Sequence, residues 1–124
     1  MMHAAMGLGV VLFAIVAHFV LVPKARPEGG LAPLVPVLLA ISLAACAVSI
    51  VLSIRIRGPS SGESAQSFWM GPGRQAIIPW ALLEGAGLLA VVVYSLTASK
   101  AAIAVAAVAI IIFALMNPGY FERR

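Results

Sequence analysis

Residues 76–97, AIIPWALLEGAGLLAVVVYSLT, decide the fold class of this chain. The stretch is apolar apart from Glu84 near its centre and a few hydroxyl-bearing side chains near its end. It is longer than the roughly 20 residues that a helix needs to cross a bilayer. Pro79 stands in the opening turn, where a helix tolerates proline. The stretch therefore predicts a transmembrane helix with one carboxyl group inside the membrane.

Three more apolar stretches accompany this one, and a polar loop at residues 55–75 separates them into two pairs. The predicted spans cover residues 4–23, 31–54, 76–97 and 101–116. The 124 residues are 63% hydrophobic and only 10% charged, whereas soluble domains are about 25% charged. We therefore predict an all-α integral membrane protein in which residues 1–124 form a single transmembrane domain. Short connections favour a four-helix antiparallel bundle, because they place neighbouring helices side by side.

The basic residues predict the orientation of this bundle. Four spans put both termini and the polar loop on one side of the membrane. That side carries Arg55, Arg57, Arg74, Arg123 and Arg124, and the other side carries Lys24, Arg26 and Lys100. Because Lys and Arg are enriched in cytoplasmic loops, we expect both termini in the cytoplasm, and we expect a bacterial inner (plasma) membrane.

Aromatic residues near the expected membrane boundaries are predicted to be interface anchors. They are Trp69, Trp80, Tyr94 and Tyr120. Trp and Tyr are enriched at headgroup depth, where one end of the ring is apolar and the other is wet. For Trp69 the alternative is packing against the protein's own surface.

Glu84 carries the functional hypothesis. At about 1.5 Å per residue, it lies roughly 12 to 15 Å below the boundary marked by Arg74, close to the bilayer midplane. An ionised carboxylate there costs at least about 2.5 to 3.5 kcal/mol, and such residues commonly belong to ion or proton pathways. Two alternatives remain: a protonated acid that joins helices by hydrogen bonds, and a contact with a ligand.

A polar stripe within residues 31–54 offers possible partners for this carboxyl group. Its members recur every three or four residues and so share one helix face: Ser42, Cys46, Ser49 and Ser53. We expect Ser42, Cys46 and Ser49 to lie at the depth of Glu84 and to support it. The alternative is that the serine hydroxyls bond to carbonyls of their own helix. Cys46 is expected to be a small packing residue rather than a reactive thiol.

Small residues indicate where helices approach closely, since packing must replace the hydrophobic drive inside lipid. Ala81 and Gly85 are spaced four apart beside Glu84 and predict such a helix contact. The many alanines of residues 101–109 are explained equally well by close packing or by a high alanine content.

His18 lies toward the opposite membrane face, and three roles are open for it. The favoured role is an interfacial ring with its tip among headgroups. The others are a relay station with Glu84, or an axial ligand to a haem or chlorophyll-type pigment. We expect no other cofactor. No metal site is expected either, because the chain has two His, one Cys and no zinc-type cluster. No role is assigned to His3.

Composition also excludes other classes of function. The formal charge is +4, but the eight Lys and Arg residues are scattered through apolar sequence, so a nucleic-acid partner is not expected. Paired carboxylates and a Ser-His-acid set are missing from the pattern, and we predict no enzymatic activity.

Residues 74–93, RQAIIPWALLEGAGLLAVVV, resemble the second helix of the proteolipid (c) subunit of rotary ATP synthases. In that family a basic, glutamine-containing loop precedes a helix with an Ala-Leu-x-Glu core, and the glutamate carries a proton or sodium ion. The resemblance implies that Glu84 is the carrier and that Arg74 and Gln75 belong to the polar loop. Residues 31–54 lack the glycine repeat of the family's first helix, so we do not expect a conventional rotor ring.

These observations predict a small polytopic membrane protein whose Glu84 handles protons or cations. Its expected partners are the lipid bilayer and further copies of the chain or other membrane subunits. The alternative is a non-catalytic accessory or assembly subunit of a larger respiratory or photosynthetic membrane complex, in which Glu84 serves assembly. A dimeric exporter of small molecules is a third possibility.

Overall fold

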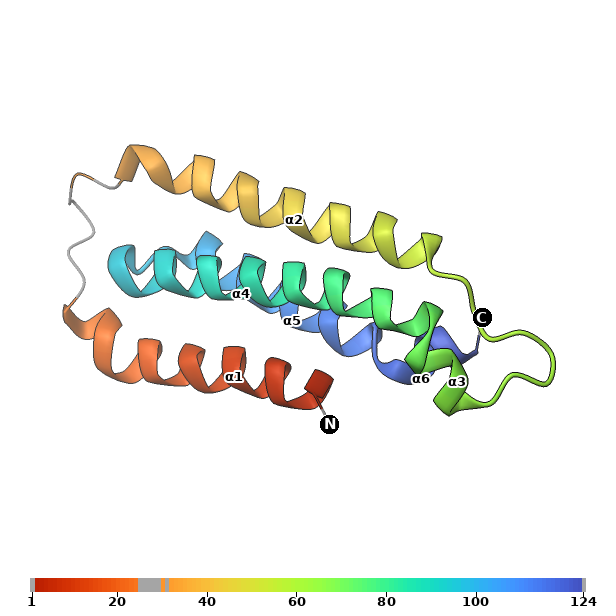
Figure 1. Ribbon diagram of the computed structural model, residues 1–124. Coiled ribbons are helices and arrows are strands. Elements are labelled where there is room, and N and C mark those ends of the chain that lie inside the picture. Colours follow the sequence, from red (N-terminus) through yellow and green to blue (C-terminus); the bar gives the residue numbers. More distant parts are fainter. Residues whose placement is uncertain (1, 25–29, 31, 124) are drawn as a thin grey trace.

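The computed structural model describes residues 2–24, 30 and 32–123, and every regular element in these ranges is helical (Figure 1). The all-α prediction is therefore confirmed for this part of the chain. Three helices are long and apolar enough to span a membrane: His3–Lys24, Ala32–Arg55 and Pro72–Thr97. This length and hydropathy are typical of an integral membrane protein.

Each long helix consists of an α-helix with a shorter turn at one end. α1 (Met2–Val16) continues through a π-helical turn (Ala17–Leu21), and a 3-10 turn (Val22–Lys24) ends it. A 3-10 turn (Ala32–Leu34) leads into α2 (Val35–Arg55). Another (Pro72–Ala76) leads into α4 (Ile77–Thr97).

The fourth apolar helix, α5 (Lys100–Leu115), is shorter than the other three. Its 16 residues extend about 24 Å, less than the roughly 30 Å of a hydrocarbon core. Only Ala98 and Ser99 separate it from α4, and Ala98 adopts the left-handed conformation (φ 53°) that often ends a helix. The short helix α6 (Pro118–Glu122) follows α5, with the Asn117 side chain accepting a hydrogen bond from the Tyr120 N–H.

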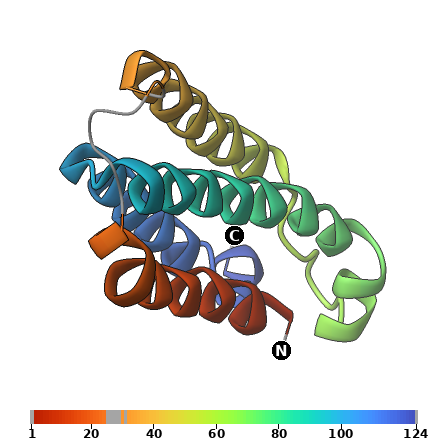
Figure 2. The same cartoon turned by 90° about the vertical axis from the view of Figure 1, so that its left-hand side faces the viewer.

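α4 lies at the centre of the bundle. It contacts α1, α2 and α5, while α1 and α2 lie on opposite sides of it (Figures 1 and 2). The start of α1, the end of α2, and the helices α3 (Ala65–Met70) and α6 all lie at one end of the bundle, here called the loop end (Figure 1). The opposite end, with the α4–α5 turn, is called the hairpin end.

Close packing around α4 depends on small residues. Ala102, Ala106 and Ala109 are the fully buried alanines of α5, which favours the close-packing interpretation of that helix. A Cβ atom on Gly87 would lie 3.1 Å from Val10 Cγ1 and 3.7 Å from Ala109 Cβ. α1, α4 and α5 therefore meet tightly at Gly87.

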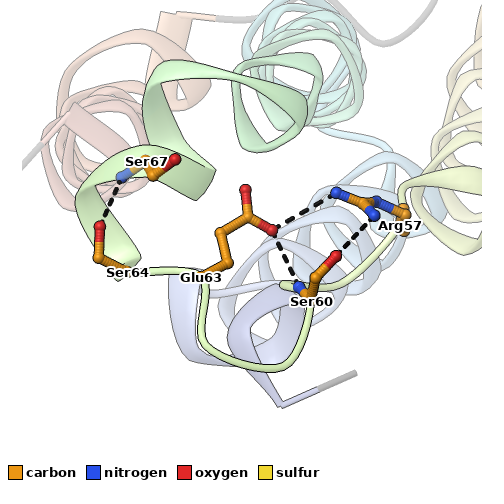
Figure 3. A network of polar contacts seen from close by, with 5 residues as sticks. All are labelled: Arg57, Ser60, Glu63, Ser64 and Ser67. Atoms are coloured by element: carbon orange, nitrogen blue, oxygen red, sulfur yellow. Dashed lines mark hydrogen bonds and ion pairs between the residues drawn. The ribbon is translucent and has the colours of Figure 1, made fainter.

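The polar loop contains more structure than its turn residues predict. The Arg57 guanidinium contacts the Glu63 carboxylate at 3.4 Å and donates to Ser60 Oγ at 2.7 Å (Figure 3). Ser64 Oγ accepts the Ser67 N–H and so caps α3, while Phe68 from α3 is completely buried. The helix α3 forms within a sequence that is rich in Gly and Ser because the Ser64 cap and the buried Phe68 ring stabilise it.

Candidate functional site

Glu84 lies in a seam between three helices. Its side chain is half-buried and lines a small cavity of about 10 Å³. Leu83 and Glu84 come from α4, and the other lining residues are Gly7 and Val10 from α1 and Ala109, Ile110 and Phe113 from α5. All residues but Glu84 are apolar. The cavity is at the lower limit of size for a single water molecule.

The Glu84 carboxyl group has no hydrogen-bond or ionic partner among the described residues. Its oxygens keep some accessible surface, since no unpartnered polar side-chain atom in the described part is fully buried. The nearest cation in sequence is Arg74, which lies in the 3-10 turn before α4, about 15 Å away at the helical rise. An apolar seam thus holds a carboxyl group that nothing within the described chain neutralises.

The polar stripe on α2 faces α4, as the periodicity predicts, because Ser42, Cys46 and Ser49 are all buried. Neither the Ser42 nor the Ser49 hydroxyl donates to the Glu84 carboxyl group. Ser42 Oγ donates to the Leu38 carbonyl of its own helix at 3.2 Å. Ser49 Oγ donates across the α2–α4 interface to the Pro79 carbonyl at 2.8 Å. The stripe therefore joins α2 to α4, while Glu84 lies in the seam that α4 forms with α1 and α5.

Ala81 and Gly85 do not make the helix contact that their spacing predicts within this chain. Both are exposed, and a Cβ atom on Gly85 would meet nothing within 4 Å. The tight contact of α4 is made instead by Gly87, two residues further on. The small face beside Glu84 is left on the outer surface of the bundle.

His18 pairs with Tyr94 at the hairpin end. Its Nδ1 lies 2.7 Å from the Tyr94 hydroxyl oxygen, and the two rings are nearly parallel with centroids 6.2 Å apart. Tyr94 is buried in one cluster with Ala17 of the π-helical turn, whereas His18 is exposed. Tyr94 lies ten residues beyond Glu84, or about 15 Å along α4. The buried Val91 lies between them, so His18 and Glu84 are not in direct contact.

The His18–Tyr94 pair gives a first testable prediction. In a double-mutant cycle of His18→Phe and Tyr94→Phe, we expect a coupling free energy of about 0.5 to 1.5 kcal/mol, the usual range for one hydrogen bond between membrane helices. Unfolding in dodecyl maltoside by added SDS, followed by circular dichroism, measures the four stabilities. Strictly additive effects would show that the pair does not join α1 to α4.

His3, to which the sequence assigns no role, belongs to an aromatic cluster at the loop end. This cluster consists of His3, Trp69, Trp80, Phe113 and Phe121. His3 Nε2 donates to the Phe113 carbonyl at 2.9 Å, and its ring stacks on Phe113 with centroids 4.2 Å apart. The sequence does not indicate this role, because the residues next to His3 are neither polar nor aromatic.

Both tryptophans predicted as anchors belong to this cluster. Trp80 is only 4% exposed, and its indole N–H donates to the Met116 carbonyl at 2.7 Å. Trp69 is half-buried and donates to Glu122 Oε1 at 2.7 Å. Trp69 thus makes the packing contact that was the alternative to a headgroup anchor. Tyr120 is half-buried and lies edge-on to Phe121 with centroids 5.1 Å apart.

The aromatic cluster forms one wall of an open cleft of about 380 Å³, here called the loop-end cleft. Its lining residues are His3, Trp69, Gly73, Arg74, Ile77, Trp80 and Pro118. A Cβ atom on Gly73 would lie 2.8 Å from a Phe68 ring carbon and 2.9 Å from a Trp69 ring carbon. Only glycine allows the backbone to approach these rings so closely.

Within the described ranges, no three His, Cys, Asp or Glu side chains are grouped so that they could hold a metal ion. Comparisons of the chain with protein-family models, characterised sequences and solved structures give no match.

Proposed function

We propose that this chain is a small membrane protein in which Glu84 takes up and releases a proton or another cation inside the membrane. The observation that carries this proposal is the half-buried Glu84 carboxyl group, which has no partner among the described residues and is surrounded by an apolar seam. Such a group binds a positive ion favourably, because the bilayer penalises an uncompensated negative charge. A role as glue between helices of the same chain would require a bonded partner, and the described part of the chain supplies none.

The packing around Glu84 is tight on both sides. Toward the loop end, a Cβ atom on Gly7 would lie 3.1 Å from a Phe113 ring carbon, and toward the hairpin end a Cβ atom on Gly87 would lie 3.1 Å from Val10 Cγ1. Passage of an ion to or from Glu84 therefore requires α1 to move away from α4 and α5.

We further propose that the protein acts as a homo-oligomer in the membrane. Ala81 and Gly85 leave an exposed small-residue face beside Glu84, and the carboxyl oxygens keep accessible surface. A second copy packed on this face would cover the carboxyl group and shield it from lipid. In this oligomer, α5 and α6 together cross the membrane as a fourth span. The loop end faces the cytoplasm, because basic residues are enriched on that side.

A lipid-soluble carbodiimide tests ion binding at Glu84 directly. The protonated carboxyl adds across a C=N bond of the reagent, and the acyl group then moves to nitrogen to leave a stable N-acylurea. We expect intact-protein mass spectrometry to show one adduct on the wild-type protein. A bound proton should speed its formation, because the reagent adds to the protonated acid, whereas a bound sodium or potassium ion should slow it.

Two variants control this labelling experiment. Glu84→Gln should remain unmodified, whereas Glu122→Gln should react like the wild type, because Glu122 is exposed and held by Trp69. The proposal is wrong if Glu84 reacts at the same rate at every proton, sodium and potassium concentration, because no cation then binds to the carboxyl group.

A further inference from the structure

The loop-end cleft contains an arginine side chain, Arg74, that has no partner among the described residues. The proposed ion binding at Glu84 does not involve this side chain. Arg74 lines the cleft, its side chain is exposed, and it makes no hydrogen bond or ion pair with the described residues. The carboxylates described at this end are engaged elsewhere, because Glu122 accepts the indole N–H of Trp69 and Glu63 pairs with Arg57. The guanidinium therefore keeps its full capacity to bind an external anion, and its planar fork suits the two oxygens of a phosphate.

The rest of the cleft is apolar and aromatic. Both indole N–H groups are already used, by Glu122 and by the Met116 carbonyl, so Trp69 and Trp80 line the cleft with ring carbons. Ile77 and Pro118 add aliphatic surface. A ligand that fits this lining has an anionic group for Arg74 and an adjoining apolar part.

His3 adds one further requirement for the ligand. A carbonyl oxygen only accepts hydrogen bonds, so the contact with Phe113 places a proton on His3 Nε2. In a neutral ring Nδ1 is then an acceptor, and it has no partner among the described residues. An acceptor beside the cleft suits a ligand that carries a hydroxyl group as well as an anion.

The place of the cleft in the bundle decides what kind of molecule reaches it. Gly73 and Arg74 lie at the start of the apolar helix Pro72–Thr97, where a membrane-spanning helix passes from headgroups into hydrocarbon. The cleft is open, and its volume of about 380 Å³ lies within the usual range of small-molecule sites. A lipid presents its phosphate and its first methylene groups at this depth.

We propose that the loop-end cleft binds the headgroup of an anionic phospholipid with a hydroxyl-bearing headgroup, of the phosphatidylglycerol type. Arg74 contacts the phosphate, His3 Nδ1 accepts from a headgroup hydroxyl, and the faces of Trp69 and Trp80 pack on the glycerol backbone and the first methylene groups. This site is independent of ion binding at Glu84.

Intrinsic fluorescence tests this site without a label. The chain contains two tryptophans, and both line the cleft, so bromine atoms on a bound lipid quench the whole signal from close by. The protein is reconstituted in phosphatidylcholine vesicles that contain increasing fractions of brominated phosphatidylglycerol or, in parallel, brominated phosphatidylcholine. We expect the brominated phosphatidylglycerol to quench at a several-fold lower mole fraction.

Two arginine variants separate a specific site from general surface charge. Arg74→Gln should reduce the preference for phosphatidylglycerol about five-fold, the effect of one basic side chain near a membrane surface. Arg55→Gln removes a cation at the same end of the bundle that does not line the cleft, and it should leave the preference unchanged. Circular dichroism confirms that both variants keep the wild-type helix content.

Three results would overturn the proposal. The two brominated lipids could quench the wild-type protein equally, or Arg74→Gln could keep the full preference. The third result is that glycerol 3-phosphate or inorganic phosphate in solution abolishes the preference for phosphatidylglycerol at constant ionic strength. This result would identify a site for soluble phosphates instead of a lipid.

Discussion

Replacing Glu84 with glutamine is expected to reduce proton or cation flux in proteoliposomes at least about 100-fold, the lower end of the effect of one positioned proton-transfer group. Glutamine has the same shape as glutamate, but its side chain neither ionises nor takes up and releases a proton or a cation. The seam around residue 84 is apolar and holds no other titratable side chain among its described lining residues. No neighbouring group therefore substitutes for the lost carboxyl.

The matched control for this variant is Glu122→Gln. Glu122 is an exposed carboxylate on α6, so its replacement removes one negative charge from the protein without changing the seam. The measurement is the decay of an imposed pH gradient, or of a sodium or potassium gradient, in vesicles with equal amounts of each protein. A Glu84→Gln protein that conducts like the Glu122→Gln protein would remove Glu84 from the pathway.

Trp80→Ala is expected to lower the free energy of unfolding by about 3 to 5 kcal/mol, as for other large buried aromatic residues. Trp80 is 4% exposed, and its ring contacts rings that come from three other parts of the chain: His3, Trp69 and Phe121. Its indole N–H also donates to the Met116 carbonyl. The alanine variant leaves a cavity at the point where α1, α3, α4 and α6 meet.

Trp80→Phe separates the ring from the hydrogen bond. This variant keeps an aromatic ring and loses the indole N–H, so we expect a cost of about 1 to 2 kcal/mol. Unfolding by SDS in dodecyl maltoside, followed by circular dichroism, measures both variants. If Trp80→Ala costs less than Trp80→Phe, the aromatic cluster does not hold the loop end together.

Hydropathy predicts the long helices of this chain well, because membrane helices satisfy their own backbone hydrogen bonds and need only an apolar surface. Periodicity also identifies the buried face of α2, since Ser42, Cys46, Ser49 and Ser53 are all buried. Their partners could not be predicted. A serine hydroxyl bonds equally well to its own helix, as Ser42 does, or to a neighbouring helix, as Ser49 does.

The contact face of α4 is harder to predict, because small residues occur on several of its faces. Ala81 and Gly85 have the spacing of a close helix contact, yet the contact is made by Gly87. The choice between these faces depends on the shapes of Val10 and Ala109, which belong to other helices. A single helical sequence does not contain that information.

The contacts between the two histidines and aromatic residues could not be predicted from the sequence, for a related reason. His18 meets Tyr94, and His3 meets Phe113, across large distances in sequence. Each pair depends on the relative rotation and shift of α1 against α4 and α5. Sequence spacing gives the approximate depth of a residue in the membrane, but it does not give these rotations.

The most direct test of the account is the flux of the wild-type protein itself. Purified protein is reconstituted in vesicles, a proton, sodium or potassium gradient is imposed in turn, a trapped dye selective for that ion reports its decay, and protein-free vesicles serve as the blank. We predict that at least one gradient decays clearly faster with the protein than without it, and that the hydrophobic carbodiimide stops this decay. If all three gradients decay at the rate of the protein-free vesicles, Glu84 does not carry ions across the membrane, and the central proposal is wrong.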